Sequence, residues 1–181
     1  MYLYLIFSKT ETWLSKVLRI FLQTKYVHSA ISLEETLKTM YSFGRVDPYN
    51  PFSGGFTQES FRTGIYIKNQ NCECLVYRIQ ITEDQYAVLM NEISKFLSSS
   101  MSFRYNFIGL FTAAFNIPLK RKNYYFCSQF VSELLIKINV LDSSITPELI
   151  KPTDLLRLDA KEKVFEGLTR KYEVIPHQIA Q

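Results

Sequence analysis

The stretch from Cys127 to Ile138 constrains the fold more than any other segment, because its residue pattern is that of an amphipathic helix. Apolar residues recur every three or four positions, the spacing of a single helix face. They are Phe130, Val131, Leu134, Leu135 and Ile138. Polar residues occupy the positions between them, which is typical of a helix with one buried face. We predict a helix that packs against a core and carries Cys127 in its first turn.

The position of Cys127 matters chemically, because a helix N-terminus has free N–H groups and a partial positive charge that stabilise a thiolate. The basic run 120–122 shortly precedes it and would act in the same direction if the fold keeps it close. The N–H groups of Cys127 and Ser128 could also stabilise an oxyanion on a substrate. The alternative is an unreactive buried cysteine, since most free cysteines behave as small apolar residues.

Length and composition indicate an ordinary globular chain. The 181 residues suit one domain, 1–181, that buries a core without disulfides or metals. The net charge is +4, and with no basic run longer than three residues nucleic-acid binding is not indicated. Cys72, Cys74 and Cys127 form neither a disulfide framework nor a zinc-ligand pattern. We therefore expect no metal and no cofactor.

Two apolar stretches raise the question of export or membrane insertion. The N-terminal MYLYLIF has no basic region before it and is too short for a signal peptide. The segment from Phe103 to Leu119 is interrupted by polar residues and is too short to span a bilayer. We expect a cytoplasmic protein.

Along the chain, strand and helix patterns alternate. Strands are predicted at 2–7, 25–33, 37–45, 64–69, 72–81 and 163–175. Helices are predicted after two capping-box patterns, Ser8 with Glu11 and Thr82 with Gln85. The first of these helices would bury Trp13, Leu14, Val17, Leu18 and Phe21. Further helices are predicted at 105–115, 127–138 and 151–158. The strands 25–33 and 37–45 are close enough to form an antiparallel hairpin, so we predict an α+β fold with an antiparallel sheet packed against helices.

The segment 46–63 is predicted to be a long loop, because it contains two prolines and the pair Gly54-Gly55. One interpretation is a loop over a cleft, in which Tyr49, Phe52 and Phe56 form an apolar wall for a substrate. The other is a surface excursion with no bearing on function.

His28 is the histidine with a candidate role, because His177 lies close to the C-terminus. On its predicted strand His28 shares a face with Ala30 and Ser32, whose small side chains leave room for a partner. A histidine on a strand and a cysteine at a helix start are the two parts of a thiol nucleophile and its base. The imidazole takes the thiol proton, and the resulting ion pair keeps the sulfur as thiolate.

Two motifs carry a resemblance to a known family. "YVHSAISLEETLKTMYSFGR" followed by "YYFCSQFVSELL" resembles the circularly permuted papain-like amidases. These are the YiiX-like relatives of the NlpC-type cysteine peptidases and of lecithin:retinol acyltransferase. In ordinary papain-like enzymes the cysteine precedes the histidine, whereas in this group, as here, His28 precedes Cys127. The resemblance covers residues 1–158 in element order and implies a permuted papain-like fold with Cys127 as nucleophile and His28 as base.

A third residue that orients the imidazole is expected on the strand after the histidine, because relatives carry a polar residue there. Ser42 comes first, since the hairpin brings it near His28. Glu59 is the charged alternative, from the long segment. The geometry expected for this site puts the Cys127 sulfur within about 4 Å of a His28 ring nitrogen.

The resemblance implies a thiol-dependent hydrolase, of the amidase or peptidase type, that attacks an amide or ester carbonyl and forms an acyl thioester on Cys127. Its substrate would be a peptide, a cell-wall-type amide or a lipid acyl group, and the acyl acceptor would be water or another molecule. One alternative is a catalytically weak or inactive binding protein of the same fold. The other is a lipid acyltransferase or hydrolase at a membrane surface, favoured by the aromatic content and the basic run 120–122. No nucleic acid is expected as a partner.

Overall fold

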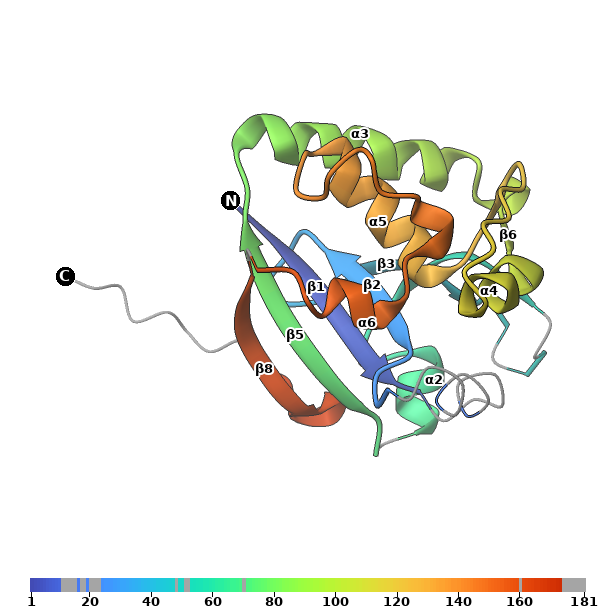
Figure 1. Cartoon of the computed structure of the whole chain (residues 1–181). Coiled ribbons are helices and arrows are strands. Elements are labelled where there is room, and N and C mark those ends of the chain that lie inside the picture. Colours follow the sequence, from blue (N-terminus) through green and yellow to red (C-terminus); the bar gives the residue numbers. More distant parts are fainter. Residues whose placement is uncertain are drawn as a thin grey trace.

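The computed structural model describes residues 1–10, 16, 19, 24–47, 49–50, 53–69, 71–159 and 161–173. They form a mixed α+β structure around one eight-stranded sheet with the order β7-β6-β4-β3-β2-β1-β5-β8 (Figure 1). The strands are β1 (Tyr2–Lys9), β2 (His28–Ser32), β3 (Met40–Arg45), β4 (Gly54–Glu59), β5 (Glu73–Gln80), β6 (Arg104–Tyr105), β7 (Tyr124–Tyr125) and β8 (Glu162–Leu168). Neighbouring strands run antiparallel except for β6 and β7.

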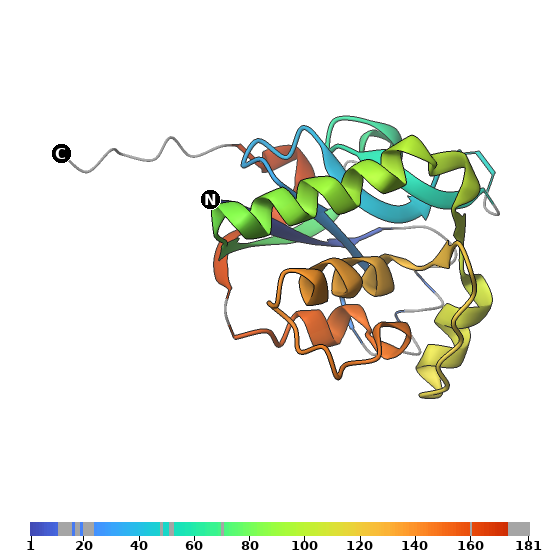
Figure 2. The same cartoon turned by 90° about the horizontal axis from the view of Figure 1, so that it is seen from above.

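Five helices and three short 3-10 turns lie between and after these strands in the described part of the chain. They are α2 (Gly64–Lys68), α3 (Glu83–Ser98), α4 (Phe107–Ala114), α5 (Cys127–Lys137) and α6 (Pro152–Leu155), with short 3-10 turns η1 (Ser100–Ser102), η2 (Pro147–Leu149) and η3 (Thr169–Lys171). Figure 2 shows α5 and α6 on one side of the sheet and α2 on the other. None of the helices in the described part of the chain is both long and apolar enough to cross a bilayer.

The sheet is buried on both faces, because side chains of both orientations in β1 are apolar. Alternate residues of β1 belong to two separate clusters: Leu3, Leu5 and Phe7 to one, and Tyr4 and Ile6 to the other. The first cluster also contains the apolar faces of α3 and α5. The second contains Tyr66 of α2 and is smaller. This two-sided burial fixes the register of the central strands, because a slip by one residue would exchange the two faces.

A group of aromatic rings fixes α5 against the sheet. Phe43 of β3 is fully buried, and its ring centroid lies 5.8 Å from that of Phe56, 5.9 Å from Phe96 and 5.4 Å from Phe130. These rings come from β4, α3 and α5 respectively. Because aromatic rings bury large areas in specific geometries, this contact holds the first turns of α5 in a defined position over the sheet.

Most of the predicted elements are present. The strands at 2–7 and 72–81 are confirmed as β1 and β5, and the hairpin is confirmed as β2 and β3, which pair antiparallel. The helix after Thr82 is confirmed with its complete capping box. The predicted helices 105–115, 127–138 and 151–158 correspond to α4, α5 and α6. The last strand, β8, ends at Leu168 and is followed by η3, so it is shorter than 163–175.

Two local predictions are wrong. The segment 64–69 is the helix α2, which begins at Gly64 with φ +59° and buries Tyr66 while leaving Ile67 exposed. A short apolar run is compatible with the two-residue period of a strand and with the 3.6-residue period of a helix. The positive φ at Gly64, a conformation that favours glycine, starts a helix here. Ser8 is no helix cap either, because it lies within β1, where it pairs with His28. The apolar residues expected in the helix after it, 13, 14, 17, 18 and 21, lie outside the described residues.

The segment 46–63 contains a strand, β4 (Gly54–Glu59). Val46 N donates to Ser53 O at 2.9 Å and closes a turn, after which β4 pairs with β3. Its glycines allow close packing of the next strand: a Cβ on Gly54 would lie 2.6 Å from Cβ of Tyr105, and a Cβ on Gly55 would lie 2.7 Å from the carbonyl oxygen of Phe103. Glycine within a strand often marks such a close approach, which explains why the pair resembled a loop in the sequence.

Candidate active site

Cys127 is the first residue of α5, after Phe126 in extended conformation at the N-cap. Its sulfur lies 3.9 Å from the carbonyl oxygen of Val27, just before β2, and the residue is 2% exposed. Ser128 Oγ donates to the carbonyl oxygen of Ile150 at 2.6 Å and holds the segment after η2 against the helix. The role of the Ser128 N–H as an oxyanion donor stays a prediction. The helix start therefore lies at the end of a central strand.

His28 is the first residue of β2 and lies between a carboxylate and the thiol. Its Nε2 is 3.2 Å from Oε1 and 3.1 Å from Oε2 of Glu59. Because both partners are acceptor oxygens, Nε2 carries a proton and donates it to them, which leaves Nδ1 for the thiol. His28 and Cys127 interact closely enough that each shifts the pKa of the other. The exact distance between the sulfur and the ring stays a prediction.

The end of the β2–β3 ladder explains how His28 reaches both neighbours. By strand alternation His28 shares the face of Ala30, which belongs to the second cluster, whereas α5 covers the first. Within the described residues, β2 and β3 pair at Ile31 and Tyr41 alone. His28 still pairs with Ser8 of β1 but is the first residue of β2, so its imidazole lies at the end of the strand, where it meets Cys127 as well as Glu59.

Glu59 is held by three donors. Besides His28, Ser42 Oγ donates to Oε1 at 2.6 Å and Tyr66 Oη donates to Oε2 at 3.2 Å. Tyr66 Oη in turn lies 3.1 Å from Ser8 Oγ. Burial would raise the pKa of Glu59, but His28 and the two hydroxyl groups lower it, and the net shift is downward. Glu59 is therefore an ionised carboxylate in a buried site.

The predicted order of the two orienting residues is wrong. Glu59 contacts the imidazole directly, and Ser42 contacts Glu59. The β3–β4 register, which pairs Met40 with Glu59, puts Glu59 on the same face as Ser42, so that it reaches His28. The sequence did not reveal this, because Glu59 was assigned to a loop instead of a strand.

Gly44 makes room for this pair. A Cβ at this position would lie 2.7 Å from Oε1 of Glu59 and 3.4 Å from Cε1 of His28. Any other residue would displace the carboxylate, so Gly44 is part of the site, although sequence analysis did not single it out. The sequence did contain a signal for it: a glycine inside a predicted strand, two residues after Ser42, often marks a close approach of another group.

The charge state of the thiol follows from its neighbours. Burial alone would raise the pKa of Cys127, but His28 and the backbone and side chain of Ser29 lower it, and the net shift is downward. Burial alone would lower the pKa of His28, yet Glu59 and Cys127 raise it well above its usual value. In Cys74, by contrast, burial raises the pKa of the thiol. The arrangement therefore favours a thiolate–imidazolium pair at Cys127 and His28.

Tyr105 is a further residue of the site. It lies in β6, and burial first, and then the interaction with Cys127, raise the pKa of the phenol well above its usual value. The ring packs on Phe107 with centroids 4.7 Å apart. Sequence analysis missed Tyr105, because only the pairing of β6 with β4 at Gly55 brings it to the site.

The predicted apolar wall is wrong at Phe56. Phe56 is buried in the aromatic group around Phe43, so it offers no surface to a substrate. Tyr49 is mostly exposed and lies under Nζ of Lys68, which is 3.3 Å from its ring centroid. Phe52 lies outside the described residues. The segment thus contributes β4, which supplies Glu59 to the site and Phe56 to the core.

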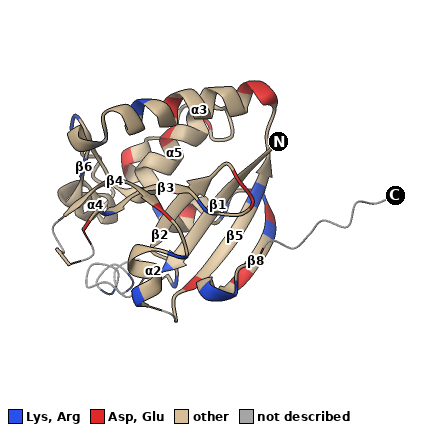
Figure 3. Cartoon of the chain, turned by 180° about the vertical axis from the view of Figure 1, so that it is seen from behind, with Lys and Arg blue, Asp and Glu red and all other residues tan. Residues whose placement is uncertain are grey.

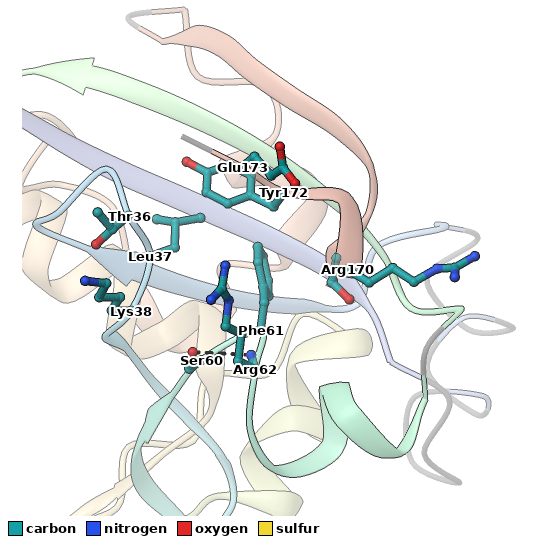
Figure 4. A pocket seen from close by; sticks show the side chains of 10 residues that line it. Thr36, Leu37, Lys38, Ser60, Phe61, Arg62, Arg170, Tyr172 and Glu173 are labelled. Carbon is teal, nitrogen blue, oxygen red and sulfur yellow. Dashed lines mark hydrogen bonds between the residues drawn. The ribbon is translucent and has the colours of Figure 1, made fainter. Parts of the chain in front are cut away.

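A separate cavity of about 290 Å³ lies at the second cluster (Figure 4). Figure 4 shows Arg62 beside Phe61, with Tyr172 above them and Arg170 directed away. Its lining residues are Thr36, Leu37, Lys38, Ser60, Phe61, Arg62, Thr169, Arg170, Tyr172 and Glu173. His28 and Cys127 are not among them. In the described part of the chain, no group of three or more His, Cys, Asp or Glu residues could hold a metal ion.

Comparisons with known proteins identify no relative: no protein-family model matches the chain, and neither a curated protein nor a solved structure matches it.

Proposed function

We propose that this protein is a cysteine hydrolase with a permuted papain-like fold, acting on an amide or ester carbonyl. The observation that carries the proposal is the arrangement of Cys127 at the start of α5 beside His28, whose far nitrogen is held by the ionised Glu59. A nucleophile, a base and a group that orients the base are the parts that thiol catalysis requires.

In the proposed reaction, Nδ1 of His28 holds the proton of Cys127, and the thiolate sulfur forms a bond to the carbonyl carbon of the substrate. The carbonyl oxygen becomes an oxyanion, stabilised by N–H groups at the start of α5. The intermediate expels the amine or alcohol, which takes the proton from His28, and leaves an acyl thioester on Cys127. Water then attacks with His28 as base, which releases the acid and restores the thiol.

Glu59 supports both steps by holding the imidazole in one tautomer. With Nε2–H donated to the carboxylate, Nδ1 faces the thiol and accepts its proton. The carboxylate also stabilises the imidazolium that forms. Ser42 and Tyr66 in turn hold the carboxylate. A neutral orienting residue such as Ser42 would have favoured a catalytically weak protein. The charged Glu59 in that position does not.

One observation favours a second candidate, a binding protein of the same fold without efficient catalysis. Cys127 is only 2% exposed, so a carbonyl can reach the sulfur only after neighbouring side chains move. A protein in which that movement does not occur would keep the arrangement without turnover.

A small activated ester, p-nitrophenyl acetate, tests the proposal. Intact-mass and peptide analysis should find an acetyl group on Cys127, with continuing release of p-nitrophenol. His28→Ala should abolish both, whereas Cys72→Ala, a change at a thiol outside the site, should leave them unchanged. An adduct that forms without turnover would support the second candidate. Absence of any adduct on Cys127 in the folded protein would rule out the hydrolase.

A further inference from the structure

The α4 end of the molecule carries exposed apolar side chains that no described residue covers. Ile108, Phe111 and Phe115 recur at helical spacing and are 57%, 37% and 70% exposed. Ile117 follows at 56%. The opposite side of α4, with Leu110 and Ala113, packs in the first cluster, and α4 lies at one edge of the molecule (Figures 1 and 2). Contiguous exposed apolar side chains mark interaction sites, because they cost free energy in water.

The backbone holds these residues together as one surface. The carbonyl oxygen of Thr112 accepts from the N–H groups of both Phe115 and Ile117 at 3.0 Å. Asn116, with φ +59°, turns the chain at this point. Ile117 is thus tied to the last turn of α4, so the apolar residues of the helix and of the following segment stay adjacent.

The basic run 120–122 lies beside the same surface. The segment after Ile117 runs back along α4, because Asn106 Nδ2 donates to the carbonyl oxygen of Leu119 at 3.2 Å and Nη1 of Arg121 lies 3.5 Å from Asn106 Oδ1. Asn106 caps the N-terminus of α4, which adds the positive end of the helix dipole. Lys120 and Lys122 are exposed, and the nearest acid to Lys120, Glu148 at 3.9 Å, is itself buried.

The charge of this part of the chain has a single sign. Between Glu92 and Glu133 there is no Asp or Glu, whereas Lys95, Arg104 and the run 120–122 are all basic. Elsewhere the signs are mixed, as on β8, where Lys and Glu lie side by side (Figure 3). An apolar surface flanked by exposed lysines complements an anionic lipid surface, where apolar side chains enter the interface and basic ones meet headgroups.

We propose that α4 and the segment that follows it form a docking surface for anionic membranes. The surface comprises Ile108, Phe111, Phe115, Ile117, Lys120 and Lys122. The competing occupant is a protein partner, of which a second copy of this chain is the simplest case. The exposed lysines of this surface would repel each other between two copies, which disfavours self-association through this face. The proposal does not depend on catalysis at Cys127. Tyr105 of the candidate site lies two residues before α4. If the docking surface and the hydrolase both hold, the candidate site would therefore lie close to the lipid.

Co-sedimentation with phosphatidylcholine vesicles, with and without phosphatidylglycerol, tests the docking surface. The wild-type protein should bind the anionic vesicles and release at high salt. The double variant Phe115→Ser/Ile117→Ser and the double variant Lys120→Glu/Lys122→Glu should each lower the bound fraction by roughly tenfold or more. Ile67→Ser on α2 is the matched control, because Ile67 is 57% exposed and belongs to the other side of the sheet; it should bind like wild type.

Three results would overturn the proposal. They are wild-type protein that stays in the supernatant with anionic vesicles, double variants that bind as well as the control, and a concentration-dependent dimer of the wild type that the Phe115→Ser/Ile117→Ser change abolishes. Circular dichroism of each variant confirms that it is folded. Because the charge variant leaves the apolar residues intact, and the apolar variant leaves the charges intact, the two contributions are separated.

Discussion

Replacement of Glu59 by glutamine removes one charge from the site and keeps the shape of the side chain. The glutamine still accepts hydrogen bonds through its carbonyl oxygen, but its NH₂ group cannot accept from Ser42 or Tyr66. One of the buried hydroxyl donors therefore loses its partner. An unsatisfied buried donor costs about 1–3 kcal/mol, so Glu59→Gln should lower the free energy of unfolding by that amount and leave the protein folded.

The effect on the thiol follows from the loss of the charged partner of His28. A hydrogen bond to a charged group contributes about 1.5–3 kcal/mol, and 1.4 kcal/mol corresponds to about a factor of ten in an equilibrium. The population of the thiolate–imidazolium pair should therefore fall by roughly ten- to a hundredfold. The alkylation rate of Cys127 at neutral pH should fall by the same factor, because only the thiolate reacts.

The measurement is the rate of iodoacetamide modification as a function of pH, with the modified cysteine identified by peptide mass spectrometry. Glu162→Gln is the control, because Glu162 is a mostly exposed acid of the same sheet that pairs with Arg78. It should leave the rate unchanged. If folded Glu59→Gln protein reacts at the wild-type rate across the pH range, the carboxylate does not govern the thiol, and the argument fails.

Three further predictions concern neighbouring groups. Gly44→Ala places a Cβ 2.7 Å from Oε1 of Glu59, so it should displace the carboxylate and slow alkylation of Cys127 by roughly ten- to a hundredfold, whereas Gly167→Ala should not slow it. Tyr105→Phe removes the buried phenol that interacts with Cys127, and should move the pH dependence of alkylation to higher pH without unfolding the protein; an unchanged profile would refute this role. Burial and Glu148 raise the pKa of Glu133 to about 7, so the folded state binds this proton more tightly than the unfolded state. The stabilisation is complete below the ordinary glutamate pKa and is lost as the pH rises through 7. Urea unfolding should therefore show a loss of at most about 3 kcal/mol between about pH 5 and pH 8 from this group, and Glu133→Gln should show a smaller loss.

The sequence predicted the elements whose patterns are local and long. The helix α5 was evident from its apolar spacing, and α3 from its capping box, because neighbouring residues alone determine both features. The segment 64–69 was misassigned, because five residues do not distinguish a period of two from one of 3.6. Gly64 at positive φ decided for a helix.

The site was predictable only in part, for a reason of topology. Cys127 and His28 could be proposed from their own elements. Glu59 and Tyr105 reach the site through the pairing of β4 with β3 and of β6 with β4, and such long-range pairing leaves no local pattern. The glycines that permit this close packing, Gly44 and Gly54, both lie in strands. Gly54 was assigned to a loop, whereas Gly44 was in a predicted strand but was not singled out.

The polar network around Glu59 determines what His28 can do. A buried carboxylate is costly unless it is fully hydrogen-bonded, and here Ser42 and Tyr66 donate to it whether or not His28 is charged. The carboxylate therefore keeps these two donors when the imidazole is neutral, and the proton of a neutral His28 stays on Nε2, where it meets the carboxylate. Nδ1 is then the nitrogen that takes the proton of Cys127. It accepts from the thiol when the imidazole is neutral and donates to the thiolate once the imidazolium has formed, which distinguishes a base from a histidine that only fills space in a core.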